Sequence, residues 1–287
     1  MYSQPVKQLG VVGAGTMGIG VSHAFAERGV PVLLMDISEE ILDRARREIT
    51  RNCFTYRLLR SGGEQPNPDE VLSLIDFTTD LDRFGTVDYV VENATEDWDV
   101  KEPIYRRLDD ICQPHTVFGV NTSAISVTRV AGLTSRPDKV IGTHFMNPVP
   151  LKPVIEVIRG FHTSQETIEL TANLFEAIGK DSIVVNDSPG FVTNRVMMLT
   201  VNEAVFLLQE DVASAKDVDR LFKDCFGHKM GPLETCDLIG LDTVLLSLEV
   251  LYDSFNDPKY RPATLLKKLV HAGQLGKKSG QGFHSYV

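Results

Sequence analysis

The 287-residue chain lacks the features of a membrane protein or a disulfide-rich secreted protein. Its N-terminus, MYSQPVKQLG, has no apolar core of a signal peptide, and no apolar run approaches the roughly 18 residues that a membrane helix needs. The four cysteines, at positions 53, 112, 225 and 236, form no CxxC pair and have no histidine at metal-ligand spacing. We therefore expect a soluble cytoplasmic protein with reduced, mostly buried thiols and no bound metal.

The chain also lacks an excess of positive charge. Its formal net charge is −10, and no basic cluster is dense enough to neutralise a phosphate backbone, which argues against general nucleic-acid binding. Hydrophobic residues make up 43% and charged residues 24%, the ordinary balance of a globular protein. No internal repeat or low-complexity stretch is present. This length suits two domains or one large one.

Short apolar runs alternate with helical patterns as far as Gly160. We expect strands in LGVVGAG, VPVLLMD, VDYVVENA, HTVFGVNTSA, KVIGTHF and VIEVIRG. We expect helices in MGIGVSHAFAERG, closed by Gly29, from about Ser38, whose hydroxyl is a natural N-cap, and around KEPIYRRLDDI. Residues 61–70, SGGEQPNPDE, are expected to form an exposed loop. This alternation predicts a parallel sheet covered on both faces.

The pattern changes around VVNDSPGFVTNR. After Pro189 and Gly190, apolar residues recur at helical spacing in FVTNRVMMLTVNEAVFLLQ, AKDVDRLFKDCF, LDTVLLSLEVLYDSF and ATLLKKLVHAGQ, and no convincing strand follows. We predict an α/β domain over residues 1–185 and a smaller all-α domain over 186–287. Such apolar helices would expose much hydrophobic surface alone, so we expect some of it to pair with a second copy in a homodimer.

The segment GAGTMG fits the pattern G-x-G-x-x-G between an expected strand and an expected helix. Its glycines permit a tight turn, close approach of a pyrophosphate and close packing of helix on strand. The helix N-terminus adds free N–H groups and a positive dipole. The segment predicts cofactor contacts from five residues: Gly13, Gly15, Thr16, Met17 and Gly18.

Asp36 ends the second expected strand, eighteen positions after Gly18. A carboxylate there accepts hydrogen bonds from ribose hydroxyls and repels a 2′-phosphate, which favours NAD over NADP. The alternatives are a glycine turn without ligand, a capping aspartate, and FAD as cofactor. Because both features occur in register, the sequence predicts an NAD site.

Hydride transfer from an alcohol to NAD needs a base for the hydroxyl proton. His144 follows an apolar strand, at the edge where α/β sheets place ligands. Glu156 interrupts the apolar strand VIEVI and needs a partner, because an ionised carboxylate is costly to bury alone. Pro148 and Pro150 favour a sharp reversal that brings the two side chains together. A core histidine is the alternative for His144, but the pair predicts a base oriented by a carboxylate.

Two further polar clusters follow an expected strand or break. One is Asn121-Thr122-Ser123, and the other is Asn194 after the SPGF turn. Each suits a cap or a turn. Each equally suits hydrogen bonds to a substrate hydroxyl or carbonyl.

Taken in order, these blocks resemble the L-3-hydroxyacyl-CoA dehydrogenases, including the short 3-hydroxybutyryl-CoA dehydrogenases. The resemblance covers essentially the whole chain, through VVGAGTMG, NTSAIS, GTHFMNPVPLKPVIEVI, DSPGFVTNR, MGPLETCDLIGLD and GKKSGQGF. It implies a Rossmann-like NAD-binding domain followed by an all-α C-terminal domain that dimerises. It also implies reversible oxidation of the 3-hydroxyl of an acyl thioester by NAD+.

The resemblance also implies roles for single residues by motif position. His144 corresponds to the catalytic base and Glu156 to its electrostatic partner. Ser123 and Asn194 correspond to residues that hold substrate. The contacts at the nicotinamide end would come from five residues: Glu96, Lys101, Asn121, Asn147 and Lys278.

Two segments depart from the family, and the first is NTSA, where many relatives have NTSS. The second departure is the more serious. Members commonly carry a lysine-rich helix after the second strand that helps to bind the CoA nucleotide, whereas REITRNCFTYRLLR has arginines and no lysine. Arg51, Arg57 and Arg60 either bind phosphates, with Arg57 as a substrate contact, or form a solvated face. HFMNPVPLKP and FGHKMGPLETCDLIGLD are similar to a natural-product branch that acts on hydroxyacyl groups tethered to an acyl carrier protein. The thioester carrier therefore stays open. A dehydrogenase of free sugar acids and a non-catalytic NAD-binding protein are the other interpretations.

Overall fold

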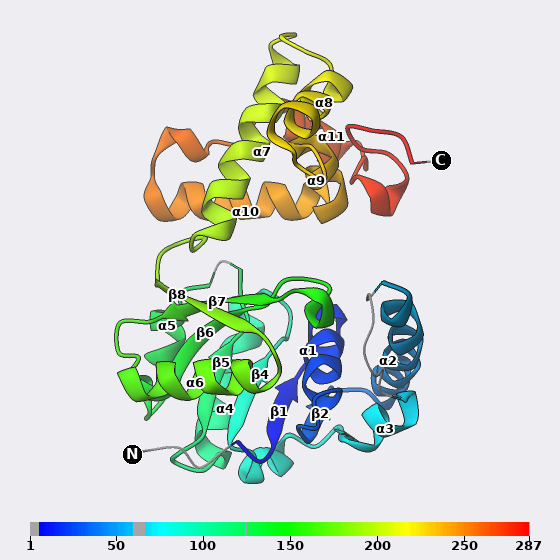
Figure 1. Ribbon diagram of the computed structural model, residues 1–287. Helices are drawn as coiled ribbons and strands as arrows, with labels where there is room; N and C mark the ends of the chain where they lie inside the picture. Colours follow the sequence, from blue (N-terminus) through cyan, green and yellow to red (C-terminus); the bar gives the residue numbers. More distant parts are fainter. Residues whose placement is uncertain (1–5, 60–66, 124, 287) are drawn as a thin grey trace. The chain divides into compact units, whose positions relative to one another are not determined.

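The computed structural model describes residues 6–59, 67–123 and 125–286. The chain divides into two compact units, Met1–Asp187 and Ser188–Val287, here called the α/β unit and the helical unit (Figure 1). The predicted order, a Rossmann-like domain followed by a helical domain, is confirmed. No helix among the described residues is long and apolar enough to cross a membrane.

The α/β unit contains an eight-stranded sheet in the order β3-β2-β1-β4-β5-β6-β7-β8. The strands are β1 (Leu9–Val12), β2 (Val32–Met35), β3 (Ile75–Thr78), β4 (Tyr89–Glu92), β5 (Val117–Val120), β6 (Val140–His144), β7 (Val154–Arg159) and β8 (Asp181–Asn186). Strands β1 to β6 pair in parallel. Strands β3 and β8 were not among the expected ones, because these edge strands are partly exposed and lack a continuous apolar run.

The expected parallel sheet is wrong at one step, because β7 runs antiparallel to β6. The connection between them passes only through the short 3₁₀ helix η3 (Val149–Leu151). A parallel crossover takes about a dozen or more residues, so this link can only turn the chain back. Strand β8 then pairs with β7 in parallel. The reversal is what brings His144 and Glu156 into register opposite each other.

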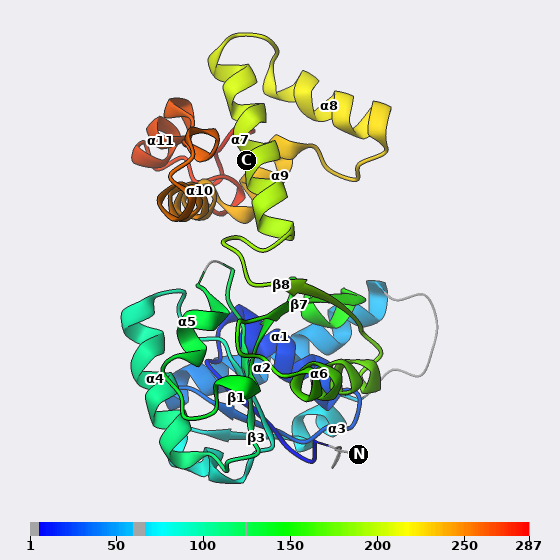
Figure 2. The same ribbon diagram turned by 90° about the vertical axis from the view of Figure 1, so that its left-hand side faces the viewer.

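Helices cover both faces of the sheet, and Figure 2 shows α1 and α6 on one side with α4 and α5 on the other. Their bounds are α1 (Thr16–Ala26), α2 (Glu39–Leu59), α3 (Pro68–Ser73), α4 (Trp98–Ile111), α5 (Val127–Ala131) and α6 (Gln165–Ala177), with 3₁₀ helices η1 (Leu81–Thr86) and η2 (Pro137–Lys139). Buried residues of β1, α1 and α6, among them Val11, Phe25 and Phe175, belong to one core cluster.

Local signals place several of these boundaries. Ser38 Oγ accepts the N–H of Glu40 at 3.2 Å, as expected for the start of α2, and Gly29 adopts φ +82 after α1. Of the loop expected at residues 61–70, residues up to 66 lie outside the described part, as does Arg60. The remainder is not a loop: Asn67 Oδ1 accepts the N–H of Asp69 at 3.1 Å and caps α3.

The helical unit contains the four expected helices and one more. They are α7 (Thr193–Gln209), α8 (Ala215–Phe226), α9 (Pro232–Ile239), α10 (Leu241–Phe255) and α11 (Thr264–His271). The 3₁₀ helix η4 (Pro258–Tyr260) lies between α10 and α11, and η5 (Lys277–Ser279) follows α11. Their apolar faces share one core that includes Val201, Leu233 and Leu248. All four cysteines of the chain are free thiols; those at 112 and 236 are buried, that at 53 is half-buried and that at 225 is exposed.

Candidate active site

The glycine turn between β1 and α1 has the backbone geometry that its sequence predicts. Gly13 adopts φ +91, and a Cβ there would lie 2.8 Å from the carbonyl oxygen of Asn93. A Cβ on Gly18 would lie 1.7 Å from the carbonyl oxygen of Gly13, so only glycine allows this packing. A Cβ on Gly15 would meet nothing within 4 Å. The turn therefore opens onto free space at the point where a pyrophosphate would approach.

The residues around this space fit a dinucleotide. The first N–H groups of helix α1, including that of Met17, have no intrahelical acceptor, because they lie in its first turn. No side chain caps the helix at Gly15. The Asp36 carboxylate accepts the N–H of Ala14 at 2.7 Å and that of Ile37 at 2.8 Å. Each carboxylate oxygen keeps a lone pair for a ribose hydroxyl.

Three predicted residues form a hydrogen-bonded chain near the carboxyl ends of the parallel strands. His144, the last residue of β6, lies with Nδ1 2.9 Å from Glu156 Oε2. Its other ring nitrogen, Nε2, lies 3.1 Å from Ser123 Oγ in the loop after β5. His144 and Glu156 are 5% and 6% exposed. Because an ionised carboxylate only accepts, Glu156 fixes the imidazole proton on Nδ1, and Nε2 is then the acceptor toward Ser123 Oγ.

Two loops support Ser123 and His144. Glu96, in the loop after β4, accepts the N–H of Ser123 at 2.9 Å and the hydroxyl of Thr122. Asn121, at the start of the loop after β5, accepts the N–H of Phe145 at 3.3 Å through its side chain.

The side chain of Asn121 also reaches the neighbouring loop. It donates to Asn93 Oδ1 at 2.6 Å, and Asn93 follows β4 directly. The N–H of Asn93 donates to the carbonyl of Val12 at 2.7 Å, so hydrogen bonds through Asn93 and Asn121 link the residue before the glycine turn with the residue after His144.

Lys101 lies beneath these loops and is fully buried on the second turn of α4. Its ammonium lies 2.9 and 2.7 Å from the two carboxylate oxygens of Glu92, the last residue of β4, which is fully buried as well. Burial raises the pKa of the Glu92 carboxyl, and the adjacent ammonium opposes that rise. Glu96 Oε2 is 3.9 Å from Lys101 Nζ.

The other predicted contacts are Asn147 and, in the helical unit, Asn194 and Lys278. Asn147 is exposed in the β6–β7 connection, and its peptide bond to Pro148 is cis. In the helical unit, Asn194 is half-buried in the first turn of α7, and Lys278 in η5 is paired with Asp242 at 2.6 Å.

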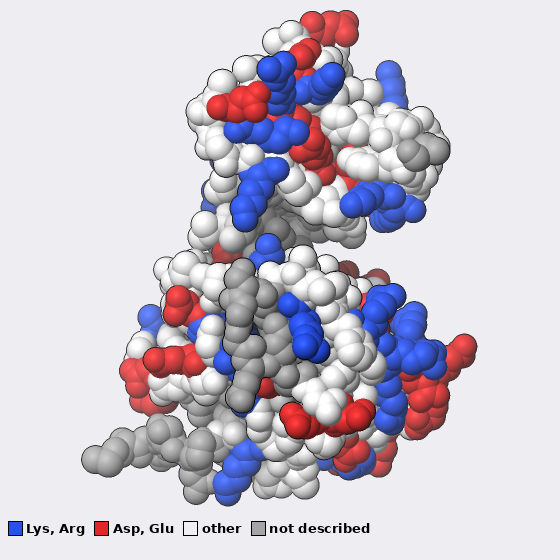
Figure 3. All heavy atoms as spheres, turned by 45° about the vertical axis from the view of Figure 1, so that its right-hand side comes forward, with Lys and Arg blue, Asp and Glu red and all other residues white. Residues whose placement is uncertain are grey.

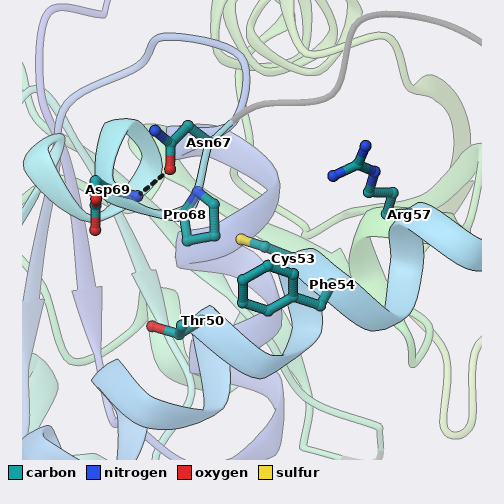
Figure 4. Close-up of a pocket in the computed structure, with 7 residues that line it drawn as sticks. All are labelled: Thr50, Cys53, Phe54, Arg57, Asn67, Pro68 and Asp69. Carbon is teal, nitrogen blue, oxygen red and sulfur yellow. Dashed lines mark hydrogen bonds between the residues drawn. The ribbon is translucent and has the colours of Figure 1, made fainter.

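Arg57 is exposed near the end of α2, at the rim of a hollow of about 400 Å³ between α2 and the start of α3. Figure 4 shows Arg57 on one side of this hollow and Asn67 and Asp69 on the other. Cys53 and Phe54 form part of the floor contributed by α2.

The sequence reasoning missed Glu92 and Asn93, whereas Thr122 belongs to the polar cluster Asn121-Thr122-Ser123 that it identified. For Glu92 a signal was present, because it is a carboxylate at the end of the apolar run VDYVVE, as Glu156 is within VIEVI. The same argument about an unpaired buried charge applies to both.

Comparison with known proteins gives the family. Residues 8–188 match the model of the 3-hydroxyacyl-CoA dehydrogenase NAD binding domain, and residues 190–286 match that of the 3-hydroxyacyl-CoA dehydrogenase C-terminal domain. The chain is 43% identical to a probable 3-hydroxybutyryl-CoA dehydrogenase of Deinococcus radiodurans, over 97% of this chain and 100% of that protein. It is 41% identical to a probable 3-hydroxybutyryl-CoA dehydrogenase of Bacillus subtilis, over 98% of each.

A solved structure agrees along the whole chain. The crystal structure of (S)-3-hydroxybutyryl-CoA dehydrogenase from Ralstonia eutropha superposes with a TM-score of 0.93 at 40% identity, covering 98% of this chain and 99% of that one. The two family models and the close relatives agree on the family, and the geometry of the glycine turn agrees with a dinucleotide cofactor. This chain belongs to the 3-hydroxyacyl-CoA dehydrogenase family and is an oxidoreductase whose cofactor is NAD.

Proposed function

We propose that this protein interconverts a short 3-hydroxyacyl thioester and its 3-ketoacyl thioester. The observation that supports the proposal is the hydrogen-bonded chain from Ser123 through His144 to Glu156. Hydrogen bonds through Asn121 and Asn93 connect the residue after His144 with the residue before the glycine turn. The relatives named above are 3-hydroxybutyryl-CoA dehydrogenases, so a short acyl group is the starting substrate class.

His144 acts as the base through Nε2, because its Nδ1–H donates a hydrogen bond to Glu156 and keeps its proton. The substrate O–H bond breaks as Nε2 takes the proton, the carbinol C–H bond breaks with loss of a hydride, and the C=O bond forms. Bound NAD+ supplies the acceptor for that hydride. Glu156 stabilises the imidazolium, and Ser123 Oγ, 3.1 Å from Nε2, orients the substrate oxygen. In the reverse direction the imidazolium returns the proton.

Other residues hold the two reactants. The N-terminus of α1 binds the pyrophosphate and Asp36 binds the adenosine ribose. Toward the nicotinamide end, the contacts of the α/β unit come from Glu96, Lys101, Asn121 and Asn147. Ser123 holds the substrate.

An NADH-formation assay with 3-hydroxybutyryl-CoA tests this function. Wild-type protein is expected to reduce NAD+ and the His144→Ala variant to do so only slowly, with NAD+ affinity by calorimetry nearly unchanged. NAD+ binding without NADH formation from any hydroxyacyl thioester would support a non-catalytic NAD-binding protein instead. Oxidation of free sugar acids but not of thioesters would contradict the proposal and identify a dehydrogenase of free sugar acids instead.

A carrier-protein ester is the second candidate substrate, and the surface of α2 favours it. From residue 49 to residue 59 this helix has no carboxylate, carries the exposed cations Arg51 and Arg57, and exposes Phe54, Leu58 and Leu59. Figure 3 shows Lys and Arg side chains, with Asp and Glu side chains next to them, on the side of the α/β unit where Figure 1 draws α2. Cations beside exposed apolar groups suit contact with an acidic helical protein better than contact with a small polar ligand.

The carrier is distinguished by presenting one hydroxyacyl group in two forms. If α2 binds a carrier protein, kcat/KM for the carrier-protein ester exceeds that for the CoA ester and falls as salt is raised. Equal or higher kcat/KM for the CoA ester would eliminate the carrier-protein candidate and leave the chemistry at His144 intact.

The helical unit is proposed to form a homodimer. Large apolar side chains remain exposed on four of its helices: Val196, Leu221, Phe226, Leu238 and Leu246. Exposed apolar side chains in such number favour a contact with another chain. Light scattering at micromolar concentration is expected to give twice the mass of the 31.8 kDa chain, and a monomer there would contradict the proposal.

A further inference from the structure

We propose that Cys53 is a reactive thiol, activated by His23 and Glu27, and that it forms a mixed disulfide with a low-molecular-weight disulfide. The disulfide would enter the hollow between α2 and the start of α3. These three residues take no part in the contacts described for His144, so the proposal does not depend on the proposed function. Its test follows the reaction of thiols and needs no dehydrogenase assay.

A thiol, an imidazole and a carboxylate lie together where α1 packs on α2. Cys53 Sγ lies 3.5 Å from His23 Nε2, within hydrogen-bonding range for sulfur, and Glu27 Oε2 lies 3.4 Å from the same nitrogen. His23 is 1% exposed, and the side chain of Glu27 is 6% exposed. The ring of Tyr56 stacks on the imidazole, with centroids 5.6 Å apart. Burial and stacking hold the imidazole in place, so Nε2 stays beside the sulfur.

This arrangement allows the thiol to transfer its proton to the imidazole. The thiolate is the form that attacks a disulfide, and an adjacent protonated histidine favours it. The Nε2–H of the imidazolium then lies beside both the sulfur and the carboxylate of Glu27, whose negative charge stabilises the cation. The three groups therefore supply a nucleophile, its base and a carboxylate that supports the base, as in enzymes with an activated nucleophile.

The sulfur also borders open space. Cys53 is half-buried and lines a hollow of about 400 Å³, with Arg57 on the same helix and Asp69 opposite as the charged groups of its lining. Figure 4 shows the sulfur on the side of α2 that faces Pro68. A hollow of this size admits a small molecule. The base lies in the core and the hollow opens to solvent, so an electrophile can reach the sulfur without displacing His23.

The other three thiols lack this combination of a base and open space. Cys112 and Cys236 are buried, and burial raises the pKa of the Cys112 thiol to about 12 and also raises the pKa of the Cys236 thiol. Cys225 is exposed near the end of α8 and has no hydrogen bond to an imidazole among the described residues. It is the matched control, because it is more accessible than Cys53 but is not activated.

The proposed step is a thiol–disulfide exchange. Cys53 Sγ attacks one sulfur of R–S–S–R, a new S–S bond joins Cys53 to R–S, and the original S–S bond breaks. The leaving thiolate takes up the proton that His23 Nε2 had accepted. The small disulfide is the oxidant: Cys53 is oxidised and the leaving thiol is reduced. An excess of small thiol reverses the step.

The test treats the full chain with oxidised glutathione at neutral pH and follows each cysteine by peptide mass spectrometry. We expect Cys53 to react about tenfold faster than Cys225, because the paired thiolate is present at neutral pH. The rate at Cys225 should rise about tenfold per pH unit, as for an ordinary thiol, and the rate at Cys53 less steeply. The two buried thiols stay unmodified while the fold is intact.

His23→Gln separates activation from exposure. Loss of the base should slow the Cys53 reaction about tenfold and give it the pH dependence of Cys225, whose own rate does not change. Glu27→Gln should slow the Cys53 reaction in the same direction, because the imidazolium loses its supporting charge. It is the variant to use if His23→Gln does not fold, which would appear as modification of the two buried thiols.

Three results would overturn the proposal. The first is a Cys53 reaction no faster than that of Cys225 in wild-type protein. The second is an unchanged Cys53 rate in both His23→Gln and Glu27→Gln. The third is a fast reaction that persists in Cys53→Ser, because another residue would then carry it.

Discussion

The α/β unit contains two regions that belong to the proposed substrate site, and they differ in construction. Around His144 the side chains are buried and hydrogen-bonded on both ring nitrogens. Along the end of α2 they are exposed: Leu58 is 87% and Phe54 is 56% accessible, and Arg57 reaches out beside them. Hydrogen bonds therefore fix the orientation of the side chains around His144. The side chains at the end of α2 present charge and apolar surface without a fixed orientation.

This difference predicts how each region responds to substitution. Buried hydrogen-bonded groups cannot be replaced by water, so their loss changes the chemistry. An exposed arginine contributes about 0–1 kcal/mol to an interaction and is screened by salt. We therefore expect single substitutions in the buried region to change the proposed chemistry, and single substitutions along α2 to have small effects on the choice of thioester carrier.

The largest effect is expected for His144→Ala. Loss of the base lowers kcat about 10³-fold, within the range typical of general acid–base catalysis, and leaves NAD+ affinity nearly unchanged. Steady-state kinetics and calorimetry measure the two quantities. The exposed His162 provides the control, because His162→Ala should behave as wild type. Turnover near normal in His144→Ala would remove this histidine from the mechanism.

Glu156→Gln is expected to lower kcat about 10²-fold. Glutamine keeps the size of the side chain and can present its amide oxygen to the Nδ1–H of His144, so the ring can keep its orientation. What is lost is the negative charge that stabilises the imidazolium. A wild-type kcat in this variant would mean that the carboxylate only orients the ring. The single-turnover rate at saturating NAD+ isolates the chemical step.

The His144–Glu156 pair could be predicted from the sequence because its signal is local. A carboxylate within a short apolar strand needs a partner, and two prolines between it and the histidine predict the reversal. The strands that β-propensity and apolar runs mark clearly were found for the same reason. The edge strands β3 and β8 were missed, since partial exposure removes that pattern.

Contacts between loops could not be predicted in this way. Glu96 and Ser123 are 27 residues apart and come from loops after different strands. Only the order of the strands, with β4 beside β5 and β5 beside β6, brings these loops together. Glu92 had a local signal, but its partner Lys101 lies in a helix whose packing no periodicity specifies.

The exposure of Asp36 is intermediate between those of the two regions, because its side chain is half-buried and both carboxylate oxygens accept hydrogen bonds. Asp36→Ser is expected to raise the KM for NAD+ about tenfold, since a hydrogen bond to a charged group contributes about 1.5–3 kcal/mol. The KM for NADP+ should fall, because the carboxylate no longer repels a 2′-phosphate. kcat with saturating NAD+ stays near wild type. Unchanged preference between the cofactors would mean that Asp36 serves only the turn of residues 13–15.

The smallest effect is expected for Arg57→Gln. Because the guanidinium is exposed, its loss should raise the thioester KM only about two- to fivefold, in keeping with an interaction of about 0.5–1 kcal/mol, and kcat should not change. Arg106→Gln is the matched control, since Arg106 is an exposed helical arginine paired with Glu102 at 2.9 Å on α4. At high salt, the thioester KM of Arg57→Gln should equal that of wild-type protein, because salt screens the charge of an exposed arginine. If Arg57→Gln lowered kcat instead, α2 would take part in fixing the reacting group, and the separation between a buried chemical region and an exposed carrier region would fail.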